Sequence, residues 1–522
     1  MPQFITPGQA AQLVKDGAVL ALGGFGSHNG PDALLQALAD RYRESAHPAK
    51  LTVVTGVSTG DNSQDDIGMN RIAIEGLIDT IIAAHLANPP KISAMAAANQ
   101  IAAYTLPLGV VVHLFRAIAG KKPGVLTHVG LNTFVDPRQE GCKVNDRARA
   151  QGREVVELVE MQGREYLFYP SFPLDICFIR GTYADEDGNI SIEHEDLTGA
   201  ELEIASAVHN CGGIVVVQVE DVVRSGSIHP RKVRIHRKFV DYVVKCPSPD
   251  LHMQNYANAA YQPALTGEIR CSAGGIAPMA MSIRKVIARR GVMELRPNCV
   301  INLGIGIPSG VGSVANEEGI NDRAILSLES GPLGGVPLEG VGFASSMNPE
   351  TINSICDTFD FYDGGFLDMT FLGAAEIDQQ GNVNVSKFGP RCPGPGGFIN
   401  ISQNTPAVYF MGGFTAGKSQ IEVADGKLNI RQDGPGVKFI RKVQQITFSA
   451  ENALRNGQRV HYITERAVFR LTPEGIELIE IAPGVDLERD ILGRMEFRPL
   501  IAEDLKVMDP RIFRDELMGL KD

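Results

Sequence analysis

A glycine-rich pattern occurs twice in this chain of 522 residues, and it restricts the possible folds more than any other feature. In each copy an apolar stretch runs into glycines, at Ala21–Gly26 and at Asn302–Pro308. A Gly-Asn pair follows in each copy, at Gly188 and at Gly381, and the next apolar stretch begins 26 residues later in both. This shared order and spacing indicate a diverged internal repeat rather than chance recurrence of short strings.

Short apolar runs alternate with helix-like stretches in both copies, which predicts an α/β fold with parallel sheets. We therefore expect two tandem, diverged open α/β domains, residues 1–275 and 276–522, with a boundary near Gly274–Gly275. The first copy spans 165 residues between its motifs and the second spans 77, so the first domain carries an insertion. Ala467–Leu471 and Ile476–Ile481, joined by Thr-Pro-Glu-Gly, predict a hairpin near the C-terminus.

Charge and cysteine usage exclude several classes of protein. Lys plus Arg number 49 against 61 Asp plus Glu, a net charge of −12, which disfavours a nucleic-acid binder. No run of 18 apolar residues occurs, so we expect no membrane-spanning helix. The eight cysteines are scattered without a C-x-x-C pair, which is typical of free thiols in the cytoplasm. Glu193–Asp196 is expected to be a solvated acidic turn rather than a metal site.

The segment Gly412–Ser419 matches the P-loop pattern G-x-x-x-x-G-K-[ST] in full. A P-loop needs a helix after it, so that the helix N-terminus can hold a phosphate. The residues that follow alternate in polarity and contain an Asp425-Gly426 turn, so they predict a hairpin. The match is therefore interpreted as coincidence, with Lys418 at the surface.

Glu329 is a lone carboxylate at the end of the apolar stretch Ile325–Leu328, directly before a Gly/Pro turn. Open α/β sheets bind ligands at such strand ends, although a solvated turn glutamate is the default for this residue taken alone. Arg391–Phe398 is a glycine-rich loop that can hold an oxyanion with its amides, or can be an ordinary loop.

Taken together and in order, these motifs resemble the family I coenzyme A transferases. The resemblance rests on Leu22–Gly26, Asn302–Pro308, Glu329–Gly331 and Gly394–Phe398, and it covers nearly the whole chain. Thr133–Gln139, Phe361-Tyr362, Tyr462–Phe469 and Ile481–Asp486 are similar to the single-chain acetate/propionate CoA-transferases. The resemblance implies an active site at the interface of the two domains, with the nucleophile carried by the second.

The resemblance also implies a role for each motif. Glu329 would be the nucleophile, ionised at pH 7 without an added base, and would form a glutamyl-CoA thioester in a ping-pong reaction. Gly396 and Gly397 would stabilise the oxyanions. CoA would be bound by Asn302, Gly304, Ile305, Gly306, Ile307, Pro308 and Asn384, and the acid by Gly24, Phe25, Gly26 and Leu108. No metal or bound organic cofactor is implied, because CoA is a substrate.

Leu108 departs from the family pattern, because relatives have glutamine at that position. An apolar group in place of a donor and acceptor argues for an unfunctionalised short-chain acid such as acetate, propionate or butyrate. Two alternatives remain open: a CoA thioester hydrolase on the same scaffold, and a nucleotide-binding protein that uses Gly412–Ser419. We expect a homo-oligomer, a dimer or a tetramer, without a nucleic-acid or membrane partner.

Overall fold

The computed structural model describes residues 1–257, 260–272 and 278–521. The chain forms two compact units. Unit 1 consists of Met1–Cys271, Leu328–Asp360 and Lys387–Gly397, and unit 2 consists of Ser272–Ser327, Phe361–Ser386 and Phe398–Asp522. The domain boundary expected near Gly274–Gly275 lies outside the described residues.

Unit 1 is built on a sheet whose central strands are parallel, in the order β1-β13-β11-β9-β2-β3-β4-β5. The short strands β10 (Ile190–Ser191) and β12 (Val233–Ile235) pair beside it. The main strands are β1 (Gln3–Phe4), β2 (Val19–Phe25), β3 (Leu51–Val57), β4 (Ile78–His85), β5 (Ala102–Thr105), β9 (Ile176–Asp185), β11 (Ile214–Val223) and β13 (Tyr242–Lys245). A smaller antiparallel sheet contains β6 (Gly124–Thr127), β7 (Glu157–Met161) and β8 (Arg164–Pro170).

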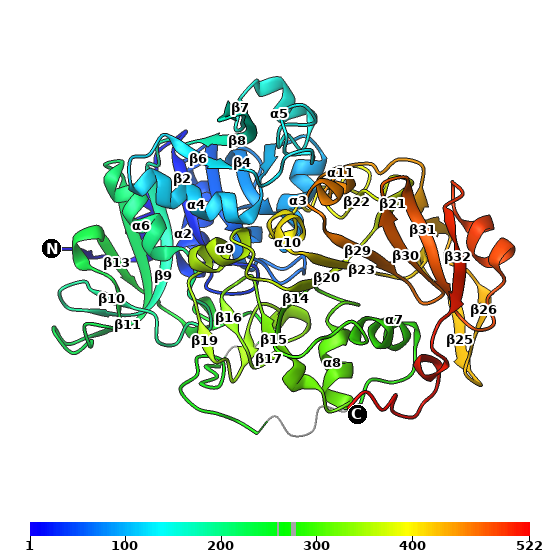
Figure 1. The fold of residues 1–522 in the computed structure, drawn as a ribbon. Coiled ribbons are helices and arrows are strands. Elements are labelled where there is room, and N and C mark those ends of the chain that lie inside the picture. Colours follow the sequence, from blue (N-terminus) through cyan, green and yellow to red (C-terminus); the bar gives the residue numbers. More distant parts are fainter. Residues whose placement is uncertain (258–259, 273–277, 522) are drawn as a thin grey trace. The chain divides into compact units, whose positions relative to one another are not determined.

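Helices cover both faces of the main sheet of unit 1. Leu20 and Leu22 of β2 join one core cluster with α1 (Pro7–Gln12), α2 (Asp32–Ser45) and α3 (Pro90–Ala97). Since side chains alternate along a strand, the residues between them face the other way. On that second face α4 (Leu108–Ala119) and α6 (Glu201–Asn210) pack side by side (Figure 1). With both faces buried, the strands are apolar almost throughout, as expected for a parallel sheet.

Unit 2 contains a mixed sheet in the order β15-β14-β20-β23-β29-β30-β31-β32, parallel from β15 to β29. Its strands are β14 (Cys299–Leu303), β15 (Ala324–Ser327), β20 (Met369–Gly373), β23 (Ala407–Met411), β29 (Arg459–Ile463), β30 (Ala467–Thr472), β31 (Gly475–Ile481) and β32 (Leu500–Val507). Its helices are α7 (Ile283–Val292), α8 (Gly310–Glu317), α10 (Phe398–Asn404) and α11 (Ala450–Arg455). The α5 helix (Asp146–Gln151) belongs to unit 1, and α9 covers Ile355–Asp363.

Strand order confirms the internal repeat. The run β13-β11-β9-β2-β3 of unit 1 corresponds to β29-β23-β20-β14-β15 of unit 2, and both runs are parallel. The two Gly-Asn turns are also built alike, because Asp185 accepts hydrogen bonds from the main chain and side chain of Asn189 as Asp378 does from Asn382. Gly188 and Gly381 both have positive φ, of 91° and 93°. The strands β4 to β8 account for the longer first copy.

The structure confirms the predicted hairpins but divides the chain differently from the predicted domains. The hairpin β30–β31 is confirmed, and the residues after Gly412 form β24 (Thr415–Ala416) and the hairpin of β25 (Gln420–Ala424) with β26 (Lys427–Gln432), so the P-loop helix is not formed. The units, however, are not consecutive in sequence. Leu328–Asp360 groups with unit 1, so Glu329 belongs to the unit of the first copy instead of an uninterrupted second domain. The chain passes from unit 2 to unit 1 between Ser327 and Leu328, directly after β15.

Candidate active site

Glu329 lies in a tight turn that follows β15. The Gly331 N–H donates to the Leu328 carbonyl at 3.0 Å and the Leu328 N–H donates to the Pro332 carbonyl at 2.9 Å, which closes the turn around Glu329 and Ser330. Gly331 has φ of +125°, and a methyl group there would lie 2.2 Å from the Asn353 carbonyl oxygen, so only glycine fits. The turn therefore presents the Glu329 side chain on a fixed backbone.

The glycine-rich loop that ends at Gly397 is docked onto β4 and α4. The Leu86 N–H donates to the Pro393 carbonyl at 2.7 Å, and the Gly396 N–H donates to the Ala84 carbonyl at 3.0 Å. The Gly396 carbonyl accepts from the N–H of Leu108, the first residue of α4, at 2.9 Å. The Gly396 amide is thus occupied within the protein, which differs from its expected role as an oxyanion donor.

Gly397 is in direct contact with the Glu329 carboxyl group. A methyl group built on Gly397 would lie 1.9 Å from Oε2 of Glu329 and 3.0 Å from the Phe359 ring. The Gly397 N–H also hydrogen-bonds the carboxylate. The structure therefore brings together two of the predicted site residues, and a side chain at position 397 would displace the carboxylate.

The pKa of Glu329 is shifted by this environment. Burial raises it to about 7 from an ordinary value of 4.5, and the hydrogen bond from the Gly397 N–H opposes the rise. The side chain retains some exposure to solvent. The carboxyl group is consequently only partly ionised at neutral pH, contrary to the expectation that it needs no help to ionise. A carboxylate of raised pKa is also a more basic nucleophile.

A small apolar cavity in unit 1 lies at the glycine turn of β2. It has a volume of about 20 Å³, room for one group the size of a water molecule or a methyl. Its lining comes from β2, β3, α4, α6 and α9: Leu22, Gly23, Gly24, Phe25, Gly56, Val57, Val112, Phe115, Gly199, Ala200, Ile204 and Ile355. Ile355 lies one turn of α9 before Phe359, the ring beside Gly397.

Only two of the four residues predicted for the acid pocket line this cavity, Gly24 and Phe25. Gly26 instead faces Asn88, whose Nδ2 would lie 3.4 Å from a methyl group added there. Leu108 is 0% exposed and packs against Gly56, a lining residue, with its Cδ1 3.3 Å from a methyl group added at that glycine. Leu108 therefore supports the cavity wall rather than forming it.

The residues predicted to bind CoA belong to unit 2. Asn302 is buried in β14, and its Nδ2 donates to the Ser327 carbonyl at 3.0 Å, two residues before Glu329 in the chain. The Gly304 N–H donates to the Phe371 carbonyl, after which the chain turns outward. Ile305 is 66% exposed, and the Gly306 carbonyl accepts from Arg284 Nη2 at 3.0 Å.

This turn runs through Ile307 and Pro308 into α8, so it presents a strand-to-helix junction to solvent. Asn384, by contrast, is buried and internally bonded: its Nδ2 donates to Glu376 Oε2 at 2.7 Å and its Oδ1 accepts from the Ser386 N–H at 3.0 Å. Its side chain therefore acts in the local structure of unit 2.

The sequence analysis did not identify Phe359, Ala84 and Ile355. The Phe359 ring lies beside Gly397, the Ala84 carbonyl accepts from Gly396, and Ile355 lines the cavity. A phenylalanine or isoleucine in a helix carries no signal of its own. The acidic segment 193–196 was also misjudged, because Glu195 and Asp196 are buried with charged partners, whereas a solvated turn was expected.

Three general features of the described residues complete this picture. All eight cysteines are free. Within residues 1–257, 260–272 and 278–521, no group of three or more His, Cys, Asp or Glu side chains is placed to hold a metal ion. In the same residues, no helix has both the length and the apolar character needed to cross a membrane.

The fold and the parallel sheets define a protein of the α/β class, and comparison with known proteins gives its family. Residues 5–246 match the family described as "Coenzyme A transferase". The chain is 43% identical over 525 residues to the caffeate CoA-transferase of Acetobacterium woodii, covering 100% of this chain and 99% of the relative. The chain belongs to the family I coenzyme A transferases.

Two further relatives agree with this assignment. The acetate CoA-transferase YdiF of Escherichia coli O157:H7 is 42% identical over 98% of this chain and 95% of its own length. Crystal structures of that protein, the apoenzyme and a thioester complex with CoA, superpose with a TM-score of 0.93 at 41% identity, covering 99% of this chain and 97% of theirs. The protein is thus a single-chain enzyme that transfers CoA between an acyl-CoA and a carboxylate.

Proposed function

We propose that Glu329 is the nucleophile of this CoA-transferase. Its carboxylate attacks the thioester carbonyl of the acyl-CoA and expels the CoA thiolate, which leaves an acyl-glutamyl anhydride. The thiolate then attacks the glutamyl carbonyl carbon, forms the glutamyl-CoA thioester and releases the first acid as its carboxylate. A second carboxylate reverses both steps. The contact between the Glu329 carboxyl group and Gly397 carries this proposal.

The Gly397 N–H serves as the oxyanion donor in this mechanism. It already hydrogen-bonds the Glu329 carboxyl group, so it is placed to stabilise the negative charge that forms there when the thiolate attacks the glutamyl carbon. Gly396 acts differently from the expectation, because its N–H and carbonyl fix the loop to Ala84 and Leu108. Asn302 and the turn Gly304–Pro308 are proposed to bind CoA, with Asn384 supporting them.

Intact-mass spectrometry after incubation with acetyl-CoA alone tests the nucleophile. The wild type should gain the mass of CoA less one water, and Glu329→Ala should gain nothing. The matched control is Glu339→Gln, an exposed glutamate of unit 1, which should gain the same mass as the wild type. An adduct on Glu329→Ala would contradict the assignment.

For the second substrate we propose a small aliphatic acid. The relatives named above act on caffeate and on acetate, and the cavity beside Gly24 and Phe25 distinguishes these classes by size. A volume of about 20 Å³ favours a methyl or similar group over an aromatic ring. Parallel measurement of acetate, propionate, butyrate and caffeate as acceptors tests this, and a preference for caffeate would contradict it.

Hydrolysis of acyl-CoA is the alternative reaction on the same residues, with water in place of the second acid. Release of free CoA from acetyl-CoA without an acceptor measures it, and we expect this rate to be far below transfer to propionate.

We further propose a homo-oligomer, a dimer or a tetramer, from the family resemblance, which light scattering during gel filtration tests. The eight free cysteines support a cytoplasmic location.

A further inference from the structure

The turn that carries Glu329 is tied to a strained residue 15 positions later. Ser330 Oγ donates to the Ala344 carbonyl at 2.5 Å, and Ser330 is buried. Ala344 has φ of +101°, a backbone conformation that residues other than glycine rarely adopt. Such strained positions persist only where neighbouring contacts hold them, and they concentrate at functional sites. The contacts on either side of Ala344 therefore bear on the position of Glu329.

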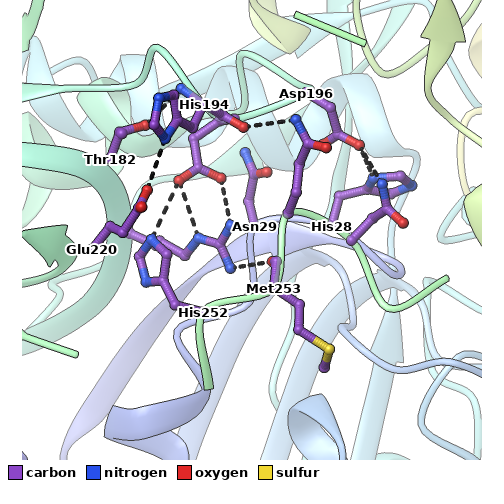
Figure 2. A network of polar contacts seen from close by, with 12 residues as sticks. His28, Asn29, Thr182, His194, Asp196, Glu220, His252 and Met253 are labelled. Atoms are coloured by element: carbon purple, nitrogen blue, oxygen red, sulfur yellow. Dashed lines mark hydrogen bonds and ion pairs between the residues drawn. The ribbon is translucent and has the colours of Figure 1, made fainter. Parts of the chain in front are cut away.

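Those contacts come from a buried ion pair. His28 Nε2 lies 2.9 Å from the Phe343 carbonyl oxygen, and His28 Nδ1 lies 2.9 Å from Asp196 Oδ2, as Figure 2 shows for the pair. On the other side of Ala344, Ser345 Oγ donates to the same Asp196 oxygen at 2.5 Å. His28 and Asp196 thus hold the residues before and after Ala344, and both side chains are 0% exposed.

The partners of His28 define its charge. A carbonyl oxygen only accepts hydrogen bonds, and Asp196 Oδ2 also accepts from Asn255 Nδ2 at 3.0 Å. The Nε2 nitrogen of His28 therefore donates to the Phe343 carbonyl, and Nδ1 faces the Asp196 carboxylate, an arrangement that favours the protonated ring. Burial is the largest influence on His28 and would lower its pKa, but the charge and hydrogen bond of Asp196 and the hydrogen bond to the Phe343 carbonyl together raise it. Burial would likewise raise the pKa of Asp196, but the charge of His28 and the hydrogen bonds from His28, Ser345 and Asn255 together lower it.

His28 also belongs to the glycine turn that borders the cavity. Its N–H and carbonyl both bond with Phe25, at 2.9 and 3.0 Å, and the hydroxyl of the neighbouring Ser27 donates to the Val341 carbonyl. One residue thus joins the turn of Gly24 and Phe25 to the segment that holds Glu329.

We propose that His28 and Asp196 are positioning residues that hold the strained Ala344 turn and, through Ser330, fix the carboxyl group of Glu329 against Gly397. This inference rests on the proposed role of Glu329 as nucleophile. It assigns a role to Asp196, a buried residue of the segment 193–196. Neither the composition nor the family motifs explain why this residue is buried. Removal of the link should leave CoA binding nearly unchanged and slow the covalent step.

The main measurement is the single-turnover rate at which the glutamyl-CoA thioester forms, monitored by intact-mass spectrometry. The kcat, the KM for acyl-CoA and the melting temperature are measured for the same variants. Ser330→Ala should slow thioester formation roughly 10- to 100-fold with KM within about threefold, because small displacements of a reacting group cost that much. The matched control is Ser206→Ala, which removes a hydroxyl-to-carbonyl bond of 2.7 Å inside α6 and should keep the wild-type rate.

Two more variants separate positioning from folding. Ala344→Gly relieves the unfavourable φ, so it should melt no lower than the wild type and yet form the thioester more slowly. His28→Gln keeps a donor for the Phe343 carbonyl but removes the cation, and its effect should be non-additive with that of Ser330→Ala.

The results distinguish the two proposals. Wild-type rates in Ser330→Ala and Ala344→Gly, with thioester formed by the wild type, would overturn the positioning role and leave the nucleophile in place. Failure of the wild type to form any thioester would overturn the nucleophile assignment itself.

Discussion

Glu329→Gln removes the charge of the nucleophile and keeps its shape, so it should stabilise the protein at high pH while abolishing transfer. The folded pKa of Glu329 is about 7 against an ordinary value of 4.5. Between these two values the folded state binds more protons than the unfolded state, so this carboxyl group lowers stability as the pH rises. The cost is absent at about pH 4.5 and complete above about pH 7.

One pKa unit corresponds to about 1.4 kcal/mol, so the charged carboxylate costs up to about 3 kcal/mol above pH 7. With an unfolding entropy of about 2 cal/mol/K per residue, that stabilisation raises the melting temperature of the variant by about 3 °C. Calorimetry at pH 5 and at pH 8.5 measures it, with Glu339→Gln as the control. Equal melting temperatures of Glu329→Gln and the wild type at pH 8.5 would refute the reasoning.

In the wild type, kcat/KM should fall as the pH drops below about 7, because protonation of Glu329 removes the nucleophile; a flat profile from pH 5 to 8 would contradict this. Gly397→Ala should abolish transfer, since its methyl group would lie 1.9 Å from Oε2 of Glu329, whereas no atom lies within 4 Å of a methyl group at Gly396 and Gly396→Ala should retain more activity. Leu108 is buried behind the cavity wall, so Leu108→Gln should lower kcat/KM for lactate, acetoacetate and propionate alike and leave their rank order unchanged; a selective gain for lactate or acetoacetate would show that position 108 contacts the acid. Lys418→Ala should leave transfer within about threefold, because Lys418 is exposed and no P-loop helix follows it; ATP binding that depends on Lys418 would contradict this.

The strand pattern could be predicted from the sequence because it depends on local chemistry. Strands buried on both faces are continuous apolar runs, and the apolar stretch expected 26 residues after Gly381 is β23, which begins at Ala407. The turn around Gly188 follows from Asp-Gly-Asn chemistry, since glycine supplies the positive φ and asparagine the side-chain bonds.

The surroundings of Glu329 could not be predicted in the same way. Its pKa is raised by burial that no local pattern expresses, and the opposing hydrogen bond comes from Gly397, which lies 68 positions away in sequence. The pairing of His28 with Asp196 joins residues 168 positions apart. The grouping of Leu328–Asp360 with unit 1 likewise depends on long-range packing, whereas the motif order alone suggested two consecutive domains.

The repeated strand order has a consequence for stoichiometry. In the second copy the chain leaves β15 through Leu328 and Glu329, and at the corresponding place in the first copy it leaves β3 through Ser58 and Thr59. Of the two equivalent strand ends, therefore, only the second carries a carboxylate, that of Glu329, which we propose as the nucleophile. A chain with two similar halves should accept a single CoA, and titration of active sites should reach one equivalent per polypeptide.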